Sequence, residues 1–572
     1  MSGALNVAVN GLWILACMKE ALAHRIWRDR VAQVQARVLM DIVQANRSSE
    51  FGRQHGFSGI RSLDQYRNRV PLSTWDEYEG AVQRLASGEQ RVLTEELVLL
   101  FEPTGGSLSG TKLVPYTREL QRQFSRGIDP WVFHLFRWQP RLITGCAYFS
   151  ITPFGSIRRN TPSGLPVGFE DDSAYLGGIM RRIGDSVLAV PRAVALISNP
   201  ALYRYVTLFF LLRRRDLALV SVWNPTFLEI VLERVNDWSE RLVADIETGR
   251  IAGMAGLEPG TRSAFQQKLK PRRRRAAELR SIFGAWQGRN PRQHDGRGRT
   301  LYEALWPRLR VISCWADANA KGPAGRLKDI LPHVEVQPKG LLSTEGFVSF
   351  PIGGMESAVL STRSHFFEFI EPAERGGAVR LAHELSRGSR YEVVMTTGGG
   401  LYRYRTHDIV EVTGAWGETP MIRFAGRADM VSDLFGEKLA EAHVRTVVEG
   451  TFRRNRISAD FWMVAPECPG SGGGFYVLFI QTAAGQGGPR VARTLAEAAK
   501  EIEAGLRTNP QYLHCIRLGQ LLPLRIFHIA KRAEEDYLSS CVAQGQRLGD
   551  VKPPALHRRP GWTVVFHGEL LP

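Results

Sequence analysis

Two stretches of the chain combine glycine, hydroxyl and charged residues in patterns that suit a phosphorylated ligand. Residues 104–112 read TGGSLSGTK, and residues 401–412 read LYRYRTHDIVEV. Glycines let a backbone approach a polyphosphate closely and donate N–H hydrogen bonds to it. In the second stretch tyrosines alternate with arginines, as in a strand with one apolar and one charged face that delivers Asp408 at its end. This carboxylate can accept hydrogen bonds from ribose hydroxyls; the alternative is that it pairs with Arg403 or Arg405.

The 104–112 loop differs from a Walker A loop, although Gly105 and Gly110 have the separation found in one. After Gly110 the order is Thr-Lys instead of Lys-Thr, and Pro115 follows three residues after Lys112. A proline at that point forbids the long helix whose N-terminus would hold the phosphates. We therefore predict a hairpin turn that leads into an extended segment. A glycine-rich hairpin without a ligand is the alternative.

The order of these elements resembles the nucleotide-binding end of adenylate-forming enzymes. Within them it is most similar to the acyl-acid amido synthetases of the auxin-responsive promoter (Gretchen-Hagen) family. That family has Tyr-Arg-Tyr-Arg-x-Gly-Asp where this chain has residues 402–408, so His407 stands at the place of a glycine, the residue that readily permits φ > 0. Phe-x-Gly-Arg-x-Asp and Gly-Glu-Lys follow at residues 424–429 and 436–438.

Three further stretches carry the same resemblance. Residues 104–112 are similar to the phosphate loop Thr-Ser-Gly-Thr-x-Gly-x-x-Lys, with Leu108 and Ser109 as departures. Residues 344–346 are similar to the end of the adenylating element Tyr-Gly-x-Ser-Glu-Gly, and Leu341 replaces the aromatic residue that would face adenine. Residues 545–554 resemble the closing loop Gln-x-Lys-x-Pro.

The resemblance implies a ligase that uses ATP and Mg²⁺ to activate a carboxylic acid as acyl-AMP and then transfers the acyl group to an amine, for which we expect an amino acid. Glu345 would orient Mg²⁺, a role that suits a carboxylate. Arg427, Lys438 and Lys552 would be catalytic, with Arg427 and the mobile Lys552 neutralising the charge that develops during transfer. The nucleotide would contact eight residues: Thr104, Gly105, Gly106, Ser107, Gly110, Lys112, Thr344 and Asp408.

Two alternatives remain open at this point. An enzyme of the same superfamily could pass the acyl group to CoA or to the thiol of a carrier protein. A catalytically silent binding protein could also retain the fold, and the departures at Leu108, Leu341 and His407 favour that interpretation. The retained polar residues favour an active enzyme: Lys112, Glu345, Asp408 and Lys552.

The remaining patterns predict an α/β protein. A large N-terminal mixed α/β adenylating domain, residues 1–428, would precede a small C-terminal α+β domain, residues 429–572, that rotates about a hinge at residues 426–429. Helices are expected over residues 25–46 and 492–506. Strands are expected over residues 217–222, 309–314, 365–370, 391–397, 461–464, 475–482 and 524–529.

Composition bounds the partners and the compartment. The formal net charge of +17 can attract nucleic acid, anionic lipid or an anionic substrate. The basic segment 262–299 contains four consecutive arginines at 272–275 but few stacking aromatics, so we interpret it as a solvated helix face instead of a nucleic-acid site, with a dock for an acidic carrier protein as the alternative.

Six scattered cysteines indicate free thiols in a cytoplasmic protein. The apolar stretch 5–18 is too short for a membrane span and predicts a packed or interfacial helix.

Overall fold

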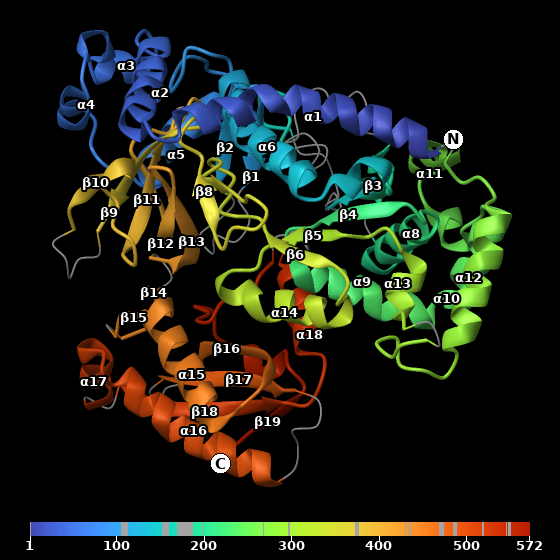
Figure 1. Ribbon diagram of the computed structural model, residues 1–572. Coiled ribbons are helices and arrows are strands. Elements are labelled where there is room, and N and C mark those ends of the chain that lie inside the picture. The colour runs from blue at the N-terminus through green and yellow to red at the C-terminus, as the bar shows by residue number, and fades with distance from the viewer. Residues whose placement is uncertain are drawn as a thin grey trace. The chain divides into compact units, whose positions relative to one another are not determined.

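The computed structural model describes residues 2–103, 112–150, 160–168, 187–197, 199–266, 268–295, 298–371, 377–428, 431–432, 434–435, 437–467, 474–483, 489–517, 520–544, 546 and 551–571. The chain forms two compact units. Unit 1 comprises Met1–Thr406 and Glu411–Phe424, and unit 2 comprises His407–Val410 and Ala425–Pro572. Figure 1 labels the elements of both units.

The helices of unit 1 lie mostly in its N-terminal two thirds. Residues 28–30 separate the first two of them, so the helix expected over residues 25–46 begins later than predicted, at Val31. The helices are α1 (Ser2–Trp27), α2 (Val31–Ala45), α3 (Glu50–Gln54), α4 (Leu63–Arg69), α5 (Asp76–Ala86), α6 (Arg118–Trp138), α8 (Pro200–Leu212), α9 (Pro225–Asp237), α10 (Ser239–Thr248), α11 (Pro259–Gln266), α12 (Arg273–Trp286), α13 (Leu301–Leu305) and α14 (Lys321–Ile330).

A parallel sheet of four strands forms one layer of unit 1. Its order is β3 (Cys146–Phe149), β4 (Leu217–Ser221), β5 (Val311–Cys314) and β6 (Glu335–Pro338). The strands β3, β4 and β5 are buried along their whole length, which is why they appear in the sequence as apolar runs without alternation. The strands expected over residues 217–222 and 309–314 are thereby confirmed.

A second sheet has seven strands in the order β10-β9-β11-β12-β13-β8-β7. Their bounds are β7 (Ser349–Phe350), β8 (Ala358–Leu360), β9 (Phe366–Ile370), β10 (Val379–Leu381), β11 (Arg390–Thr396), β12 (Tyr404–Trp416) and β13 (Thr419–Arg427). The chain passes from unit 1 to unit 2 within β12 and again within β13. A separate antiparallel hairpin joins β1 (Leu100–Pro103) to β2 (Leu113–Tyr116).

Unit 2 has a four-stranded sheet of its own, in the order β16-β17-β18-β19. The strands are β16 (Ala459–Glu467), β17 (Gly474–Thr482), β18 (Leu521–Ile529) and β19 (Gly568–Leu570), and β17 and β18 are parallel neighbours. The remaining elements are β14 (Val431–Ser432), β15 (Leu439–Ala440), α15 (Glu441–Asn455), α16 (Pro489–Leu506), α17 (Pro510–Arg517) and α18 (Ala533–Ala543). The predicted strands and the helix of this region are confirmed.

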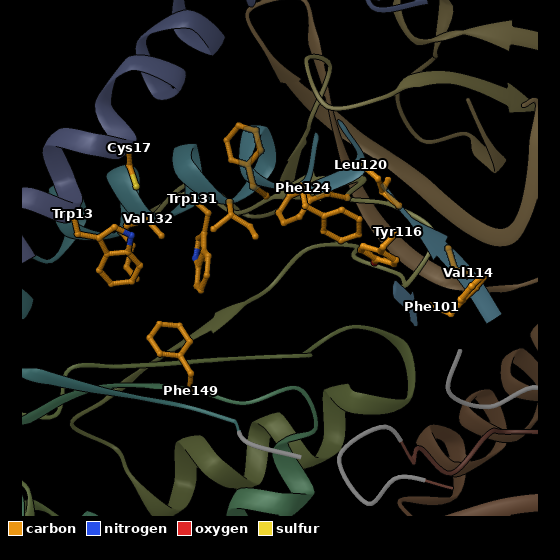
Figure 2. Packing of buried hydrophobic residues seen from close by; sticks show 14 of the residues in the cluster. Trp13, Cys17, Phe101, Val114, Tyr116, Leu120, Phe124, Trp131, Val132 and Phe149 are labelled. Atoms are coloured by element: carbon orange, nitrogen blue, oxygen red, sulfur yellow. The ribbon is translucent and has the colours of Figure 1, made fainter. Parts of the chain in front are cut away.

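A large core cluster of unit 1 is built around α6. Its apolar side chains meet residues of α1, β1, β2 and β3 in Figure 2, and the side chains labelled there are Trp13, Cys17, Phe101, Val114, Tyr116, Leu120, Phe124, Trp131, Val132 and Phe149. Trp13 of α1 contacts Phe136 and Phe149 edge to face, with ring centres 5.8 and 6.1 Å apart. α6 is therefore both a core element and, through its first turn, a neighbour of the candidate site.

Helix α1 is longer than the apolar stretch 5–18 from which it was predicted. Among the helices that the structure describes, it is the one whose length and apolar composition would suffice to cross a bilayer. Polar side chains nevertheless attach it to unit 1. The amide of Asn10 donates to the carbonyls of Ile143 and Gly145 at 2.9 and 3.1 Å, and that of Asn6 donates to Asp216 Oδ2 at 2.9 Å.

Candidate functional site

The glycine-rich stretch lies between two paired strands. β1 and β2 are antiparallel, with Pro103 opposite Leu113, so the predicted hairpin with an extended exit is confirmed at both of its strands. Residues 104–111, with the proposed contacts Thr104, Gly105, Gly106, Ser107 and Gly110, lie outside the described residues. Lys112 is described, and its ammonium lies 5.7 Å from the centre of the Trp75 ring.

The Glu345 turn is a tight hairpin that contacts the exit strand of this loop. Leu342 and Phe347 pair across it, and the phenol of Tyr116 on β2 donates to the carbonyl of Thr344 at 2.6 Å. The side chain of Glu345 is partly buried and makes no hydrogen bond or ion pair with any residue that the structure describes. The stretches around residues 104–112 and 344–346, far apart in sequence, are thus brought together, and a carboxylate projects from the turn.

A buried histidine holds the Glu345 turn from behind. His365 Nε2 accepts a hydrogen bond from the backbone N–H of Phe347 at 3.0 Å, and Nδ1 donates to Gln123 Oε1 at 2.9 Å. These two bonds require one neutral tautomer with the proton on Nδ1. Burial, with a smaller contribution from Arg126, lowers the pKa of His365 to about 3, so the ring stays neutral near pH 7.

The glycine loop at residues 398–400 shares this support. The backbone N–H of Gly398 donates to the same Gln123 Oε1 at 2.8 Å, and the hydroxyl of Thr117, the N-cap of α6, donates to the Gly398 carbonyl at 3.0 Å. Gly400 has φ +97°, and a Cβ there would lie 2.6 Å from Leu93 Cβ. The first turn of α6 therefore connects the Glu345 turn to the segment that leads into β12.

The Tyr402–Arg405 segment is structural. Arg403 is buried and bonds to Glu368 at 2.9 Å, and Arg405 bonds to Glu392 at 2.7 Å. The prediction of one apolar and one charged strand face is wrong here, because β12 begins at Tyr404 and both Tyr402 and Arg403 lie buried before it. Glutamates from neighbouring strands make this burial of arginine possible.

Asp408 lies in the interior of β12 and not at the end of a strand, as the sequence had indicated. Neither of its expected arginine partners reaches it, because both pair with glutamates. Within unit 2 its Oδ1 lies 3.4 Å from Arg427 Nη1, and Asp408 is buried whereas Arg427 is partly exposed. Two residues that the sequence placed in the site are therefore in direct contact.

His407 has a backbone conformation that a glycine would adopt more readily. Its φ is +62°, in the left-handed region that costs a residue with a Cβ about 1–2 kcal/mol. Its carbonyl accepts a hydrogen bond from the Ala428 backbone N–H at 2.7 Å. The non-glycine residue at this position therefore holds a strained, left-handed conformation within β12.

The other predicted residues of unit 2 have different surroundings. Glu437 is fully buried and accepts hydrogen bonds from the backbone N–H groups of Leu434 and Phe435, both at 2.8 Å, so it holds a turn. Lys438 beside it is exposed with φ +43°. Lys552 is partly buried, and its carbonyl accepts a hydrogen bond from the phenol of Tyr537 at 3.2 Å.

The sequence analysis missed a cluster at the carboxyl end of the parallel sheet. Lys339 Nζ donates to Ser221 Oγ at 2.6 Å and lies 5.0 and 4.8 Å from the ring centres of Trp131 and Trp223. Trp223 and Trp315 have ring centres 5.9 Å apart. Ligands of α/β proteins bind at this edge of the sheet. A signal was present, because Trp315 and Lys339 directly follow β5 and β6.

The basic segment is partly structural, which corrects its interpretation as a solvated face. Arg272, Arg273 and Arg274 are exposed, but Arg275 is buried and donates to the carbonyls of Leu212 and Leu305 at 2.8 and 2.6 Å.

The five cysteines in the described part of the chain are free and buried, as predicted for thiols. No group of three or more His, Cys, Asp or Glu side chains within the described ranges is placed to hold a metal ion.

Comparison with known proteins gives a consistent result along the chain. Models of the GH3 family match in three parts: its N-terminal domain over residues 27–336, its central domain over 358–427 and its C-terminal domain over 442–560. Indole-3-acetic acid-amido synthetase GH3.3 of Arabidopsis thaliana is 24% identical over 557 residues, which cover 91% of this chain and 88% of the relative. Indole-3-acetic acid-amido synthetase GH3.8 of Oryza sativa subsp. indica is also 24% identical, with 92% and 88% covered.

Solved structures give the same architecture. The GH3.15 acyl acid amido synthetase superimposes with a TM-score of 0.78 at 19% identity, covering 95% of each chain. The complex of AtGH3.15 acyl acid amido synthetase with 2,4-DB gives 0.80 at 19% identity, covering 96% of this chain and 95% of that one. At this identity the likeness concerns the fold, and the predicted mixed α/β class is confirmed.

Proposed function

This chain belongs to the GH3 family, and on that premise we propose that it is an ATP-dependent acyl-acid amido synthetase. It activates a carboxylic acid as acyl-AMP and transfers the acyl group to an amine, for which an amino acid is the expected acceptor. The named relatives are amido synthetases, which favours an amine over the thiol of CoA or of a carrier protein. Retention of the polar site residues favours an active enzyme over a silent binding protein.

One observation carries the proposal: the Glu345 turn is hydrogen-bonded to the strand that leaves the glycine-rich loop. A loop suited to phosphates and a carboxylate that makes no hydrogen bond or ion pair with the described residues would then belong to one site. The carboxylate suits Mg²⁺, because that ion is bound by one or two carboxylates together with substrate phosphates and water. Glu345 would hold the Mg²⁺ ion, and the bound ion would neutralise part of the phosphate charge.

In the first step a carboxylate oxygen of the acid attacks the α-phosphorus of ATP. The bond from that phosphorus to the bridging oxygen of pyrophosphate breaks, and pyrophosphate leaves with the electron pair. Loop residues 104–107 and Gly110, with Lys112 and Thr344, contact the phosphates and the nucleotide. Asp408 accepts hydrogen bonds from the ribose, and its partner Arg427 offers positive charge close by.

In the second step the amine nitrogen attacks the carbonyl carbon of acyl-AMP, AMP leaves with the bonding electrons, and the nitrogen loses a proton. Lys552 would serve the first step only, through rotation of the small C-terminal domain, taken as residues 429–572, about residues 426–429. Lys438 would be a further catalytic residue of the same small domain.

We place the acyl acid at the carboxyl end of the parallel sheet. The Lys339 ammonium lies close to the rings of both Trp131 and Trp223, so an aromatic or apolar acid would find both stacking surface and a cation for its carboxylate. The relatives are named for indole-3-acetic acid, which has that chemistry. The acid itself would be identified by screening.

The test is acid-dependent exchange of pyrophosphate into ATP across a library of carboxylic acids, followed by mass spectrometry of products formed with pooled amino acids or CoA. An acid that supports exchange should yield an amide with at least one amino acid. Glu345→Gln should lower the exchange rate at least about tenfold, whereas Glu335→Gln, at an exposed carboxylate on β6, should leave it unchanged. Products limited to acyl-CoA, or no exchange with any acid, would reject the proposed function.

A further inference from the structure

Helix α1 exposes apolar side chains along the whole of its outer side. Figure 1 shows it on the outside of unit 1, with α6 on its inner side. Monomeric soluble proteins rarely leave large contiguous apolar patches exposed, and such patches mark interaction sites. The large exposed side chains are Leu5 (51%), Val7 (41%), Leu12 (55%), Leu15 (61%), Met18 (38%), Leu22 (41%) and Ile26 (71%).

The exposed side of α1 carries positive charge and no negative charge. Lys19 and Arg25 are its exposed charged residues; directly after the helix Arg28 pairs with the exposed Asp29, and the exposed Arg30 follows. The one acidic residue of the helix, Glu20, is turned inward and bonds to Arg363. The electrostatic complement of this face is therefore an anionic surface.

The apolar face is also wide. At about 100° per residue, the exposed positions of α1 span an arc of roughly 160°, much wider than the narrow seam of a coiled coil. From Ala4 to Ile26 the face is about 33 Å long at 1.5 Å per residue. A broad, long, convex apolar face suits a flat medium better than the groove of a second helix.

The opposite face of α1 is fixed in unit 1, which rules out a spanning helix without unfolding part of that unit. Asn6 and Asn10 bond to residues around the start of β3, and Trp13 lies in the core. Farther along, His24 Nε2 bonds to the Arg126 carbonyl at 3.1 Å. A bilayer could contact only the outer face.

We propose that α1 docks unit 1 onto the surface of an anionic lipid bilayer, lying in the plane of the interface. The leucines and Ile26 enter the boundary between headgroups and acyl chains, and Lys19 and Arg25 contact anionic headgroups. A second copy of this chain is the rival occupant, but the same basic face would then meet itself and repel.

The experiment is flotation of the full chain with vesicles of phosphatidylcholine alone or with about one third phosphatidylserine. Binding to the anionic vesicles is expected, and it should weaken as salt is raised. Leu12→Gln/Leu15→Gln/Leu22→Gln should weaken it at least about a hundredfold, because three exposed apolar side chains are lost. The matched control Leu97→Gln/Leu99→Gln/Val564→Gln changes exposed apolar residues elsewhere and should bind like the parent.

A second variant keeps the proposal testable if the leucine variant fails to fold. Lys19→Gln/Arg25→Gln should weaken binding to anionic vesicles roughly 25-fold, about fivefold for each charge. Thermal unfolding midpoints would show that both variants fold. The proposal is overturned if the parent fails to bind the anionic vesicles, or if the leucine variant binds as well as the parent. A lipid-free dimer that the leucine substitutions abolish, or resistance of vesicle-bound protein to alkaline carbonate, would also overturn it.

Discussion

Replacing His365 with leucine should loosen the turn that carries Glu345. The substitution leaves the backbone N–H of Phe347 buried without an acceptor, because His365 Nε2 is the group that it bonds. A buried unpaired donor costs about 1–3 kcal/mol of unfolding free energy. His365→Gln is the matched control, since a glutamine side-chain oxygen can reach the place of Nε2 and accept the same bond.

The assay combines urea unfolding with pyrophosphate exchange measured at several Mg²⁺ concentrations. In the leucine variant we expect exchange to fall about tenfold or more and to need more Mg²⁺, because a displaced ligand or supporting group typically costs 10–100-fold in metal affinity or activity. The glutamine variant should recover most of the exchange rate and most of the parental Mg²⁺ dependence. Loss of stability with unchanged Mg²⁺ dependence would show that His365 serves folding alone and refute the positioning argument.

The pKa of His365 gives the same variants a pH signature. The folded-state pKa is about 3 and the unfolded value about 6.5, so the unfolded chain gains a proton first as pH falls. Stability is therefore complete above about pH 6.5 and is lost as pH falls from there toward 3. Between pH 7.5 and 5 this one ring should cost about 2 kcal/mol. Over the same pH range the loss of unfolding free energy should be smaller in the glutamine variant than in the parent, by about 2 kcal/mol. An equal loss in the two proteins would contradict a buried neutral ring.

Three other predictions follow from single contacts. Lys552→Ala should lower pyrophosphate exchange roughly 10²–10³-fold yet consume supplied acyl-AMP with the acceptor at nearly the parental rate, and equal damage to both steps would reject its role. His407→Gly should raise the unfolding free energy by roughly 0.5–1 kcal/mol, because relief of the left-handed strain exceeds the added freedom of the unfolded chain; a loss in urea unfolding would contradict this. Arg275→Met should cost ~2–4 kcal/mol because two buried carbonyls lose their donor, whereas exposed Arg274→Met should stay within about 0.5 kcal/mol, and equal effects would refute the buried contact.

The elements of the fold were largely predictable because their patterns are local. The apolar run at residues 217–222 identifies a buried strand by itself, and β4 lies there. The antiparallel strands around the glycine-rich loop follow from Pro115, which excludes a helix. Local pattern fails where a partner is distant: Arg403 bonds to a glutamate 35 residues earlier in the chain.

The site was predictable in part for the same reason. Glu345 was placed by motif, but its support by His365 joins residues that no spacing rule connects. Arg275 shows the limit most clearly, because four consecutive arginines appear equivalent in sequence and the structure buries one of them. Lys339 could have been found, since residues that directly follow parallel strands are natural candidates for ligand contacts.

The double passage of the chain between the two units bears on how members of this family could be recombined. A chimera joined between Glu411 and Phe424 would take Asp408 from one parent and Arg427 from the other, and so divide a pair that is in contact. A junction at Ala425 would have the same effect, and either junction would leave residues 407–410 of unit 2 with the parent that supplies unit 1. Unit 2 is therefore not a module that a single crossover at its main boundary can exchange. Crossovers placed before His407 would transfer it whole.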